Sequence, residues 1–242
     1  MQLHVYRDAD EVCNALAAWI AALIDTTLQA KEKCVIALSG GETPKILYGK
    51  LAAPPYHDKI KWDRVHIFWG DERVVPFTDD QNNAKMACDN FLDKVDIPSG
   101  NIHKMWTDMD PVASARQYEK ILHQYFDDKQ TTFDLILLGM GDDGHTLSLF
   151  PGEGIPEGQP SWVAAVYSKV KGERITLLPA VVNQSAAVVF LVTGEKKSKV
   201  LQNILQHTGN QYPAQLIQPL NKQVHWFVDE TALGNYQPAR NL

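Results

Sequence analysis

Three segments of the chain combine glycine with acids, bases or hydroxyl groups. The longest is Gly139-Met140-Gly141-Asp142-Asp143-Gly144-His145-Thr146, in which three glycines in six residues precede a histidine. A histidine can take a proton from water near neutral pH, and a nearby carboxylate can orient it. The segment is therefore a candidate acid–base site.

Two other functions are compatible with the same segment. The spacing G-M-G-D-D-G matches the G-x-G-x-x-G pattern of dinucleotide-binding loops, but it lies deep in the chain and small apolar packing residues do not follow it. Asp142, Asp143 and His145 could together bind a metal ion. No second histidine or cysteine stands at ligand spacing, so we expect neither a metal nor another cofactor.

A second segment, Ser39-Gly40-Gly41-Glu42-Thr43-Pro44, joins a predicted strand to a predicted helix. Its glycines allow close approach of a ligand, and backbone N–H groups at the start of a helix favour an anion. Ser39 and Thr43 add hydroxyl donors. An ordinary helix start, with Thr43 as N-cap and Pro44 in the first turn, explains the same residues. A P-loop is excluded because no G-K-[ST] follows.

The third segment, Gly70-Asp71-Glu72-Arg73, is expected in a turn directly after a predicted strand, where a solvated loop with a local Asp–Arg pair is the alternative to a functional role. Basic residues stand at two further places. Arg174 opens the run R-I-T-L-L-P, and Lys197 belongs to a lysine-rich helix start at 194–199. Because the helix dipole disfavours lysines at that end, these lysines could offset a bound anion.

The apolar pattern places all these segments in an α/β fold. Strands are predicted over 34–38, 65–69, 134–138, 163–167, 175–178, 187–192 and 224–228, and helices over 8–30, 44–51, 82–92, 110–126 and 197–206. Asp8 and Asp110 are the expected N-caps of two of these helices. This order predicts a mostly parallel sheet with helices on both faces, in a single domain over 1–242. Residues 151–160 are expected to form a long surface loop. Ligands bind at the carboxyl ends of such strands, where the three glycine-containing segments lie.

Composition limits the class of protein. The formal net charge is -6 and no basic stripe is present, so we expect no binding to nucleic acid or to a membrane surface. The N-terminal residues do not resemble a signal peptide, and no apolar run reaches the ~20 residues of a membrane span. Three widely spaced cysteines without a C-x-x-C pair indicate reduced, buried thiols. These features predict a cytoplasmic protein. The sequence leaves the oligomeric state open, and a monomer is compatible with it.

Together these motifs resemble the 6-phosphogluconolactonases, within a broader group that includes glucosamine-6-phosphate deaminase. The resemblance rests on S-G-G-E-T-P (39–44), G-D-E-R-V-V-P (70–76), N-I-H (101–103), G-M-G-D-D-G-H-T-L-S-L-F-P-G (139–152), R-I-T (174–176) and G-E-K-K (194–197). In the deaminases an aromatic-Asn-Glu-Pro stretch follows the histidine turn, whereas T-L-S-L-F-P-G follows it here. Leu147 stands where the family more often has alanine, which bears on the shape of the pocket.

The resemblance implies a Rossmann-like core, no metal, and a sugar-phosphate lactone as substrate in the oxidative pentose phosphate pathway. By the family pattern His145 is the general base, with Asp71, Arg73 and Asp143 beside it. The phosphate is expected on Ser39, Gly40, Gly41 and Thr43 together with Arg174 and Lys197.

The chemistry implied is attack of a His145-activated water on the lactone carbonyl. Either Asp143 or Asp71 would orient the imidazole, and Arg73 or glycine-turn N–H groups would hold the oxyanion. Two alternatives stay open at this point. One is a deaminase or isomerase that uses Asp71 as base, and the other is a non-catalytic sugar-phosphate-binding module.

Overall fold

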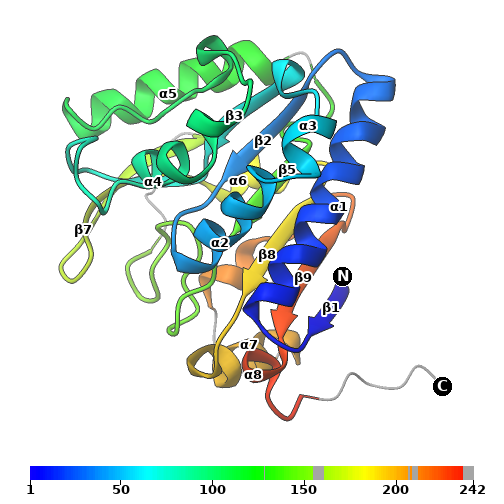
Figure 1. Ribbon diagram of the computed structural model, residues 1–242. Coiled ribbons are helices and arrows are strands. Elements are labelled where there is room, and N and C mark those ends of the chain that lie inside the picture. The colour runs from blue at the N-terminus through cyan, green and yellow to red at the C-terminus, as the bar shows by residue number, and fades with distance from the viewer. Residues whose placement is uncertain (128, 155–160, 207, 209–211, 237–242) are drawn as a thin grey trace.

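The computed structural model describes residues 1–127, 129–154, 161–206, 208 and 212–236. Its centre is a six-stranded sheet in which every neighbouring pair is parallel, in the order β1-β9-β8-β5-β2-β3 (Figure 1). The strands are β1 (Gln2–Tyr6), β2 (Cys34–Leu38), β3 (Val65–Trp69), β5 (Leu135–Leu138), β8 (Val188–Val192) and β9 (Val224–Asp229). The predicted mostly parallel α/β fold is confirmed.

Helices cover both faces of this sheet because its strands are apolar on both sides. Cys34, Ile36 and Leu38 belong to one buried cluster, and Val35 and Ala37 to the other. The first cluster includes side chains of α1, α2 and α4, and the second includes those of α5, α6, α7 and α8. The helices are α1 (Ala9–Ala30), α2 (Glu42–Leu51), α3 (Tyr56–Lys59), α4 (Asn83–Asn90), α5 (Pro111–Phe126), α6 (Pro179–Val182), α7 (Ser198–Leu205) and α8 (Glu230–Leu233).

Helix α1 lies along the sheet in front of β8 and β9 (Figure 1). As predicted, Asp8 caps it by accepting a hydrogen bond from the Glu11 N–H at 3.0 Å. By length and composition it is apolar enough to cross a membrane. Val12, Leu16 and Ile20 of this helix are nevertheless buried against the sheet. Core helices of globular proteins have the same composition, so α1 is accounted for by the fold.

A second, smaller sheet packs against the same core. It is antiparallel, in the order β4-β7-β6, and is built from β4 (Asp71–Arg73), β6 (Val163–Ser168) and β7 (Gly172–Leu177). The predicted strands at 163–167 and 175–178 therefore pair with each other as a hairpin and do not join the parallel sheet. Asp71–Arg73, expected in a turn, form a short strand because they pair with β7.

The strand prediction missed β1 and the helix prediction displaced the start of α2. β1 is an edge strand of mixed apolar and polar residues, without a buried run, and its partner β9 is more than 200 positions away in sequence. Helix α2 begins at Glu42 with Gly41 as N-cap, so Thr43 lies inside the first turn and is not the cap. Of the predicted loop at 151–160, residues 155–160 lie outside the described residues.

Two buried tyrosines fix the main chain where β2 and β3 end. The Tyr48 hydroxyl, from α2, donates to the Ser39 carbonyl at 2.6 Å and accepts from the Ser39 N–H at 3.1 Å. The Tyr118 hydroxyl, from α5, accepts from the Trp69 N–H at 2.8 Å and donates to the Trp69 carbonyl at 3.1 Å. Each hydroxyl bonds an N–H and a carbonyl that have no partner on a neighbouring strand. The two chain segments that leave these strands consequently start from fixed positions.

We predict that Tyr48→Phe lowers the free energy of unfolding by about 1–3 kcal/mol, because it leaves a buried N–H and a buried carbonyl of Ser39 without their partner. Urea denaturation measures the change. Tyr167→Phe is the matched control, since Tyr167 is 68% exposed and its loss should stay within about 0.5 kcal/mol. Equal stability of both variants would contradict this role for Tyr48.

Candidate active site

A pocket of about 230 Å³ lies at the carboxyl ends of the central strands. It is lined by Ser39, Gly40, Gly41, Asp71, Arg73, Asn83, Leu138, Gly139, Met140, Gly141, His145, Leu147 and Lys197. The lining draws on all three segments selected from the sequence, because β2, β3 and β5 are neighbours and end at the same edge of the sheet.

The histidine turn holds its acid–base pair by short-range contacts. The Asp143 Oδ1 atom lies 2.5 Å from His145 Nδ1 and also accepts the His145 backbone N–H at 3.0 Å. The turn closes through a hydrogen bond from the Gly141 N–H to the His145 carbonyl at 2.8 Å. A Cβ atom on Gly141 would stand 2.0 Å from His145 Nδ1, so the ring packs on bare backbone. Burial raises the pKa of Asp143, but the hydrogen bonds from His145 outweigh it and the net shift is downward.

Asp71 has a different partner. Its Oδ2 atom accepts a hydrogen bond from the Ser148 hydroxyl at 2.6 Å, and the Ser148 N–H is held by the Thr176 hydroxyl at 3.1 Å. Of the two aspartates left open by the sequence, Asp143 is therefore the one that contacts the imidazole. His145 Nε2 makes no hydrogen bond to a described residue, and this nitrogen is the one free to act on a water.

Arg73 and Asn83 form one wall of the pocket. The Arg73 Nη1 donates to the Gln81 carbonyl at 2.6 Å and to Asn83 Oδ1 at 2.9 Å, while Asn83 Nδ2 donates to the Asp71 carbonyl at 3.0 Å. Asn83 also touches Gly40, where a Cβ atom would come within 1.9 Å of its Oδ1. Sequence reasoning missed Asn83 because it sits at the start of a predicted helix, where asparagine has an ordinary capping explanation.

The buried carboxylate of Glu72 anchors this wall. Its Oε1 accepts the N–H groups of Asn83 and Arg73 at 2.8 and 2.7 Å, and its Oε2 accepts that of Ala84 at 2.8 Å. Burial raises the pKa of Glu72 to about 7, although the three N–H donors oppose the shift. Glu72 thereby connects β4 to the start of α4 and fixes both Arg73 and Asn83.

Hydrogen-bond donors without partners lie next to this wall, at the end of β2. Helix α2 has no side-chain cap at its amino end, where Gly40 and Gly41 line the pocket. The Ser39 hydroxyl is buried there and has no hydrogen-bond partner among the described residues. The Lys197 ammonium reaches the same pocket and lies 2.5 Å from the Asp142 carboxylate. Free N–H groups, a free hydroxyl and a cation together suit an anion.

Two residues predicted for the anion site do not line the pocket. The Thr43 hydroxyl is 2.7 Å from the Thr193 hydroxyl and joins α2 to the segment after β8. Arg174 stands on β7 directly opposite Arg73 on β4, and its Nη1 donates to the Glu173 carbonyl at 2.8 Å. Because alternate residues of a strand share a face, Arg174 is on the same face of the small sheet as Arg73 and Asp71. It lies beside the pocket wall and not in it.

Leu147, singled out for its bearing on pocket shape, is part of the lining. Its φ of 55° is in the left-handed region, which a leucine rarely adopts. Its side chain contacts Gly70, where a Cβ atom would come within 2.7 Å of Leu147 Cδ2. The close packing of these two residues joins the histidine turn to the end of β3.

The structure also decides between the alternatives for the histidine turn. No helix follows Gly139–Thr146 in the described chain up to residue 154, so the glycines do not form a dinucleotide-binding loop, which opens a helix. Asp142 and Asp143 pair with Lys197 and His145 and do not converge on one point. Among the described residues no group of three or more histidine, cysteine, aspartate or glutamate side chains could hold a metal ion.

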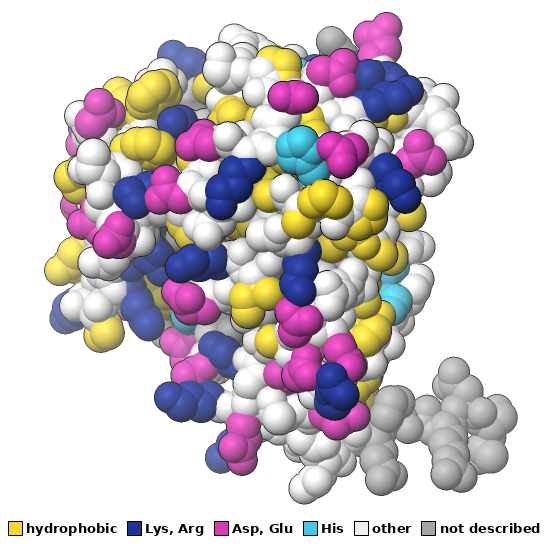
Figure 2. Space-filling model, viewed as in Figure 1, with side chains coloured by type: hydrophobic (Ala, Val, Ile, Leu, Met, Phe, Trp, Pro, Cys, Tyr) yellow, Lys and Arg dark blue, Asp and Glu magenta, His cyan; other side chains and the backbone are white. Residues whose placement is uncertain are grey.

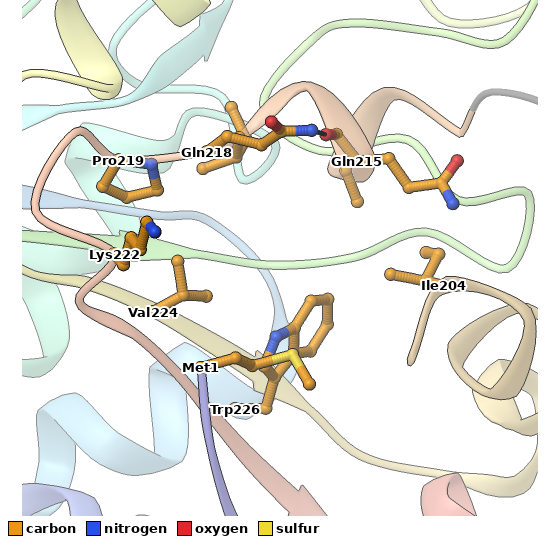
Figure 3. A pocket seen from close by; sticks show the side chains of 10 residues that line it. Met1, Ile204, Gln215, Gln218, Pro219, Lys222, Val224 and Trp226 are labelled. Carbon is orange, nitrogen blue, oxygen red and sulfur yellow. Dashed lines mark hydrogen bonds between the residues drawn. The ribbon is translucent and has the colours of Figure 1, made fainter. Parts of the chain in front are cut away.

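A second cavity, of about 360 Å³, lies beside the 3₁₀ helix η5 (Pro213–Leu216) (Figure 3). Met1, Ile204, Val224 and Trp226 make its lining largely apolar, with Lys222 at one side. The described lining contains no carboxylate, histidine or cysteine, so this cavity offers no general base. The candidate acid–base pair lies in the pocket around His145.

Comparison with known proteins identifies the family. A family model described as "Glucosamine-6-phosphate isomerases/6-phosphogluconolactonase" matches residues 7–226. The chain belongs to this family. A protein of Arabidopsis thaliana named 6-phosphogluconolactonase 3, chloroplastic, is 37% identical over 96% of this chain and 74% of its own length. One of Nostoc sp. named 6-phosphogluconolactonase is 38% identical over 88% of this chain and 89% of its own.

Solved structures of the family share the fold. A 6-phosphogluconolactonase from Thermotoga maritima has a TM-score of 0.82 and 30% sequence identity, covering 94% of this chain and 99% of its own. A monomeric glucosamine-6-phosphate deaminase has a TM-score of 0.80 at 19% identity, covering 97% of this chain and 100% of its own. At that identity the likeness to the deaminase concerns the fold alone.

The titration of Glu72 gives a prediction for stability. Between pH 4.5 and 7 the unfolded chain loses the Glu72 proton while the folded chain retains it, so stability falls as the pH rises. We expect the stability of the wild type relative to a Glu72→Gln variant to fall by about 1–3 kcal/mol across this range. Urea denaturation of both proteins at a series of pH values measures it. A difference that is constant or rises with pH would contradict burial as the dominant effect on Glu72.

Proposed function

We propose that this chain hydrolyses 6-phosphogluconolactone to 6-phosphogluconate, a step of the oxidative pentose phosphate pathway, with residues 1–242 acting as one unit. The observation that carries the proposal is that one pocket brings a histidine–carboxylate pair together with an uncapped helix start, a buried hydroxyl and a lysine that suit an anion. A sugar-phosphate lactone has the matching parts, an electrophilic carbonyl at one end and a phosphate at the other. The names of the relatives above point to the same reaction.

In the proposed mechanism His145 Nε2 takes a proton from a water whose oxygen attacks the lactone carbonyl. Asp143 keeps the imidazole in place through Nδ1 and stabilises its protonated form, as the acid does in a catalytic triad. When the tetrahedral intermediate collapses, the bond from the carbonyl carbon to the ring oxygen breaks. His145 returns its proton to that oxygen, so the proposed reaction needs no cofactor.

Arg73 is the proposed stabiliser of the oxyanion. Its guanidinium lines the pocket, and its described hydrogen-bond acceptors are neutral, Asn83 Oδ1 and the Gln81 carbonyl. Because no described carboxylate forms an ion pair with this guanidinium, its positive charge is available to stabilise a developing oxyanion. Ser148 holds the carboxylate of Asp71 on the same side of the pocket, where it can contact the sugar hydroxyls.

The phosphate is proposed to bind at the amino end of α2. Gly40 and Gly41 supply N–H groups, Ser39 supplies its hydroxyl, and Lys197 supplies a positive charge. Arg174, on the pocket-side face of the small sheet, would add a second cation from the rim, and Thr43 would support the loop through Thr193. Since the phosphate does not react, these contacts serve binding and orientation.

No general affinity for nucleic acid or membranes is proposed. Acidic and basic side chains are interspersed over the face seen in Figure 2, without a broad basic area. We propose a cytoplasmic location, which three buried free cysteines support. Burial raises the pKa of Cys13 to about 11 and that of Cys34 to about 12, which keeps both thiols unreactive. Some plant relatives are named as chloroplastic.

We predict that His145→Ala lowers kcat for 6-phosphogluconolactone by about 10²–10⁴-fold, because it removes the general base. Turnover is followed with freshly generated lactone and corrected for spontaneous opening. The control is His57→Ala, which removes a histidine whose Nδ1 also lies 2.7 Å from an aspartate, Asp58, but on the surface. Retention of full activity by His145→Ala would overturn the assignment of the base.

We predict that Arg174→Ala raises KM about 10- to 100-fold with a smaller change in kcat, because a charge-assisted hydrogen bond to the phosphate contributes about 1.5–3 kcal/mol. Steady-state kinetics on the same substrate measures both constants. The control is Arg116→Ala, which removes an arginine from the exposed side of α5. An unchanged KM would remove Arg174 from the phosphate site.

A further inference from the structure

Asp142 lies next to the proposed catalytic pair but takes no part in it. Its neighbour Asp143 bonds to His145, whereas the Asp142 Oδ1 lies 2.5 Å from the Lys197 Nζ. The pair joins the turn after β5 to the 3₁₀ helix η4 (Glu195–Lys197), 55 residues further along the chain. The Asp142 side chain is 57% exposed and that of Lys197 is 25% exposed. The contact is therefore reached by solvent, and its lysine lines the pocket.

The main chain beneath Lys197 is fixed independently of this pair. The Asp229 carboxylate accepts the Gly194 N–H at 3.0 and 3.1 Å, and the Lys197 N–H donates to the Gly194 carbonyl at 3.1 Å. Asp229 also caps α8 through the Ala232 N–H at 2.7 Å. Removing the Asp142 charge therefore frees the Lys197 ammonium while its backbone stays in place.

Lys197 faces donors that have no partner. Gly40 and Gly41, at the uncapped start of α2, line the same pocket, and so does the buried Ser39 hydroxyl without a partner among the described residues. One carboxylate, that of Asp142, thus neutralises the cation next to these donors. Any anion that binds them meets the negative charge of Asp142 and competes with it for Lys197.

We propose that Asp142 attenuates phosphate binding, because it occupies Lys197 until a phosphate displaces it. This inference rests on the proposed function, because it concerns the phosphate end of the same site. A phosphate monoester carries about 1.5–2 negative charges near neutral pH and three acceptor oxygens, more than the single charge of a carboxylate. It can satisfy Lys197, the α2 N–H groups and Ser39 at once, and Asp142 cannot.

The strength of the pair suits such an exchange. Exposed ion pairs contribute about 0–1 kcal/mol, so a dianion can break this one at small cost. A sugar lactone without a phosphate brings no charge to replace Asp142 and leaves the pair intact. Asp142 thus lowers the affinity of the site for phosphorylated ligands and leaves the binding of uncharged sugars unaffected.

The test is calorimetric titration of the full chain with inorganic phosphate at neutral pH and low salt, without turnover. The variants are Asp142→Asn, Lys197→Ala and the double variant. Asp108→Asn is the control for net charge, since Asp108 is exposed and distant in sequence from the turn. We expect Asp142→Asn to bind phosphate about twofold to tenfold more tightly than the wild type. Lys197→Ala should bind more weakly, and Asp108→Asn should bind as the wild type does.

The double variant decides whether Asp142 acts through Lys197. We expect its phosphate affinity to be within about twofold of that of Lys197→Ala, because without the Lys197 ammonium there is no cation for which Asp142 and phosphate compete. Unchanged or weaker binding by Asp142→Asn overturns the proposal, as does an equal gain with and without Lys197. Binding is measured apart from lactone hydrolysis, so a chain that shows this pattern but no turnover would contradict the proposed reaction and leave the role of Asp142 standing.

Discussion

The end of a parallel strand leaves an N–H and a carbonyl without ladder partners, and here two tyrosine hydroxyls supply them. Tyr48 reaches the main chain of Ser39 from one layer of helices, and Tyr118 reaches that of Trp69 from the other. Both hydroxyls are buried, so each bond has no competing water. The segments that carry Gly40 and Asp71 leave the sheet from these fixed points. The pocket depends on these fixed points, because the segments that line it follow different strands.

Three parts of the pocket lining are held by different physical means. Around His145 the contacts are local, within a turn of a few residues whose glycines leave room for the ring. Around Arg73 they are long-range, since the buried Glu72 carboxylate draws the start of α4 onto β4. The start of α2 differs again, because it has no side-chain cap and the Ser39 hydroxyl beside it has no partner among the described residues. A histidine–carboxylate pair beside such donors fits the proposed reaction, in which one end of the substrate is held and the other reacts.

The sequence predicted what short-range patterns determine. The buried strands at Cys34–Leu38 and Val65–Trp69 follow from their apolar runs, and the caps at Asp8 and Asp110 follow from local chemistry. Such patterns do not predict which distant segments pair with each other. They include the edge strand β1, the antiparallel hairpin of β6 and β7, and the place of Asn83 in the pocket. Arg174 was assigned to the phosphate by resemblance. Its place on β7, opposite Arg73 on β4, is known only from the fold.

We propose that this pocket binds a phosphorylated lactone as its substrate. The test is to assay the wild-type protein with freshly generated 6-phosphogluconolactone and, separately, with glucosamine-6-phosphate. A metal chelator is present in both assays. We expect lactone consumption far above the spontaneous rate and no release of ammonia. A lactone rate equal to the spontaneous one would contradict the account, and ammonia release would assign the pocket to the deaminase reaction of the same family.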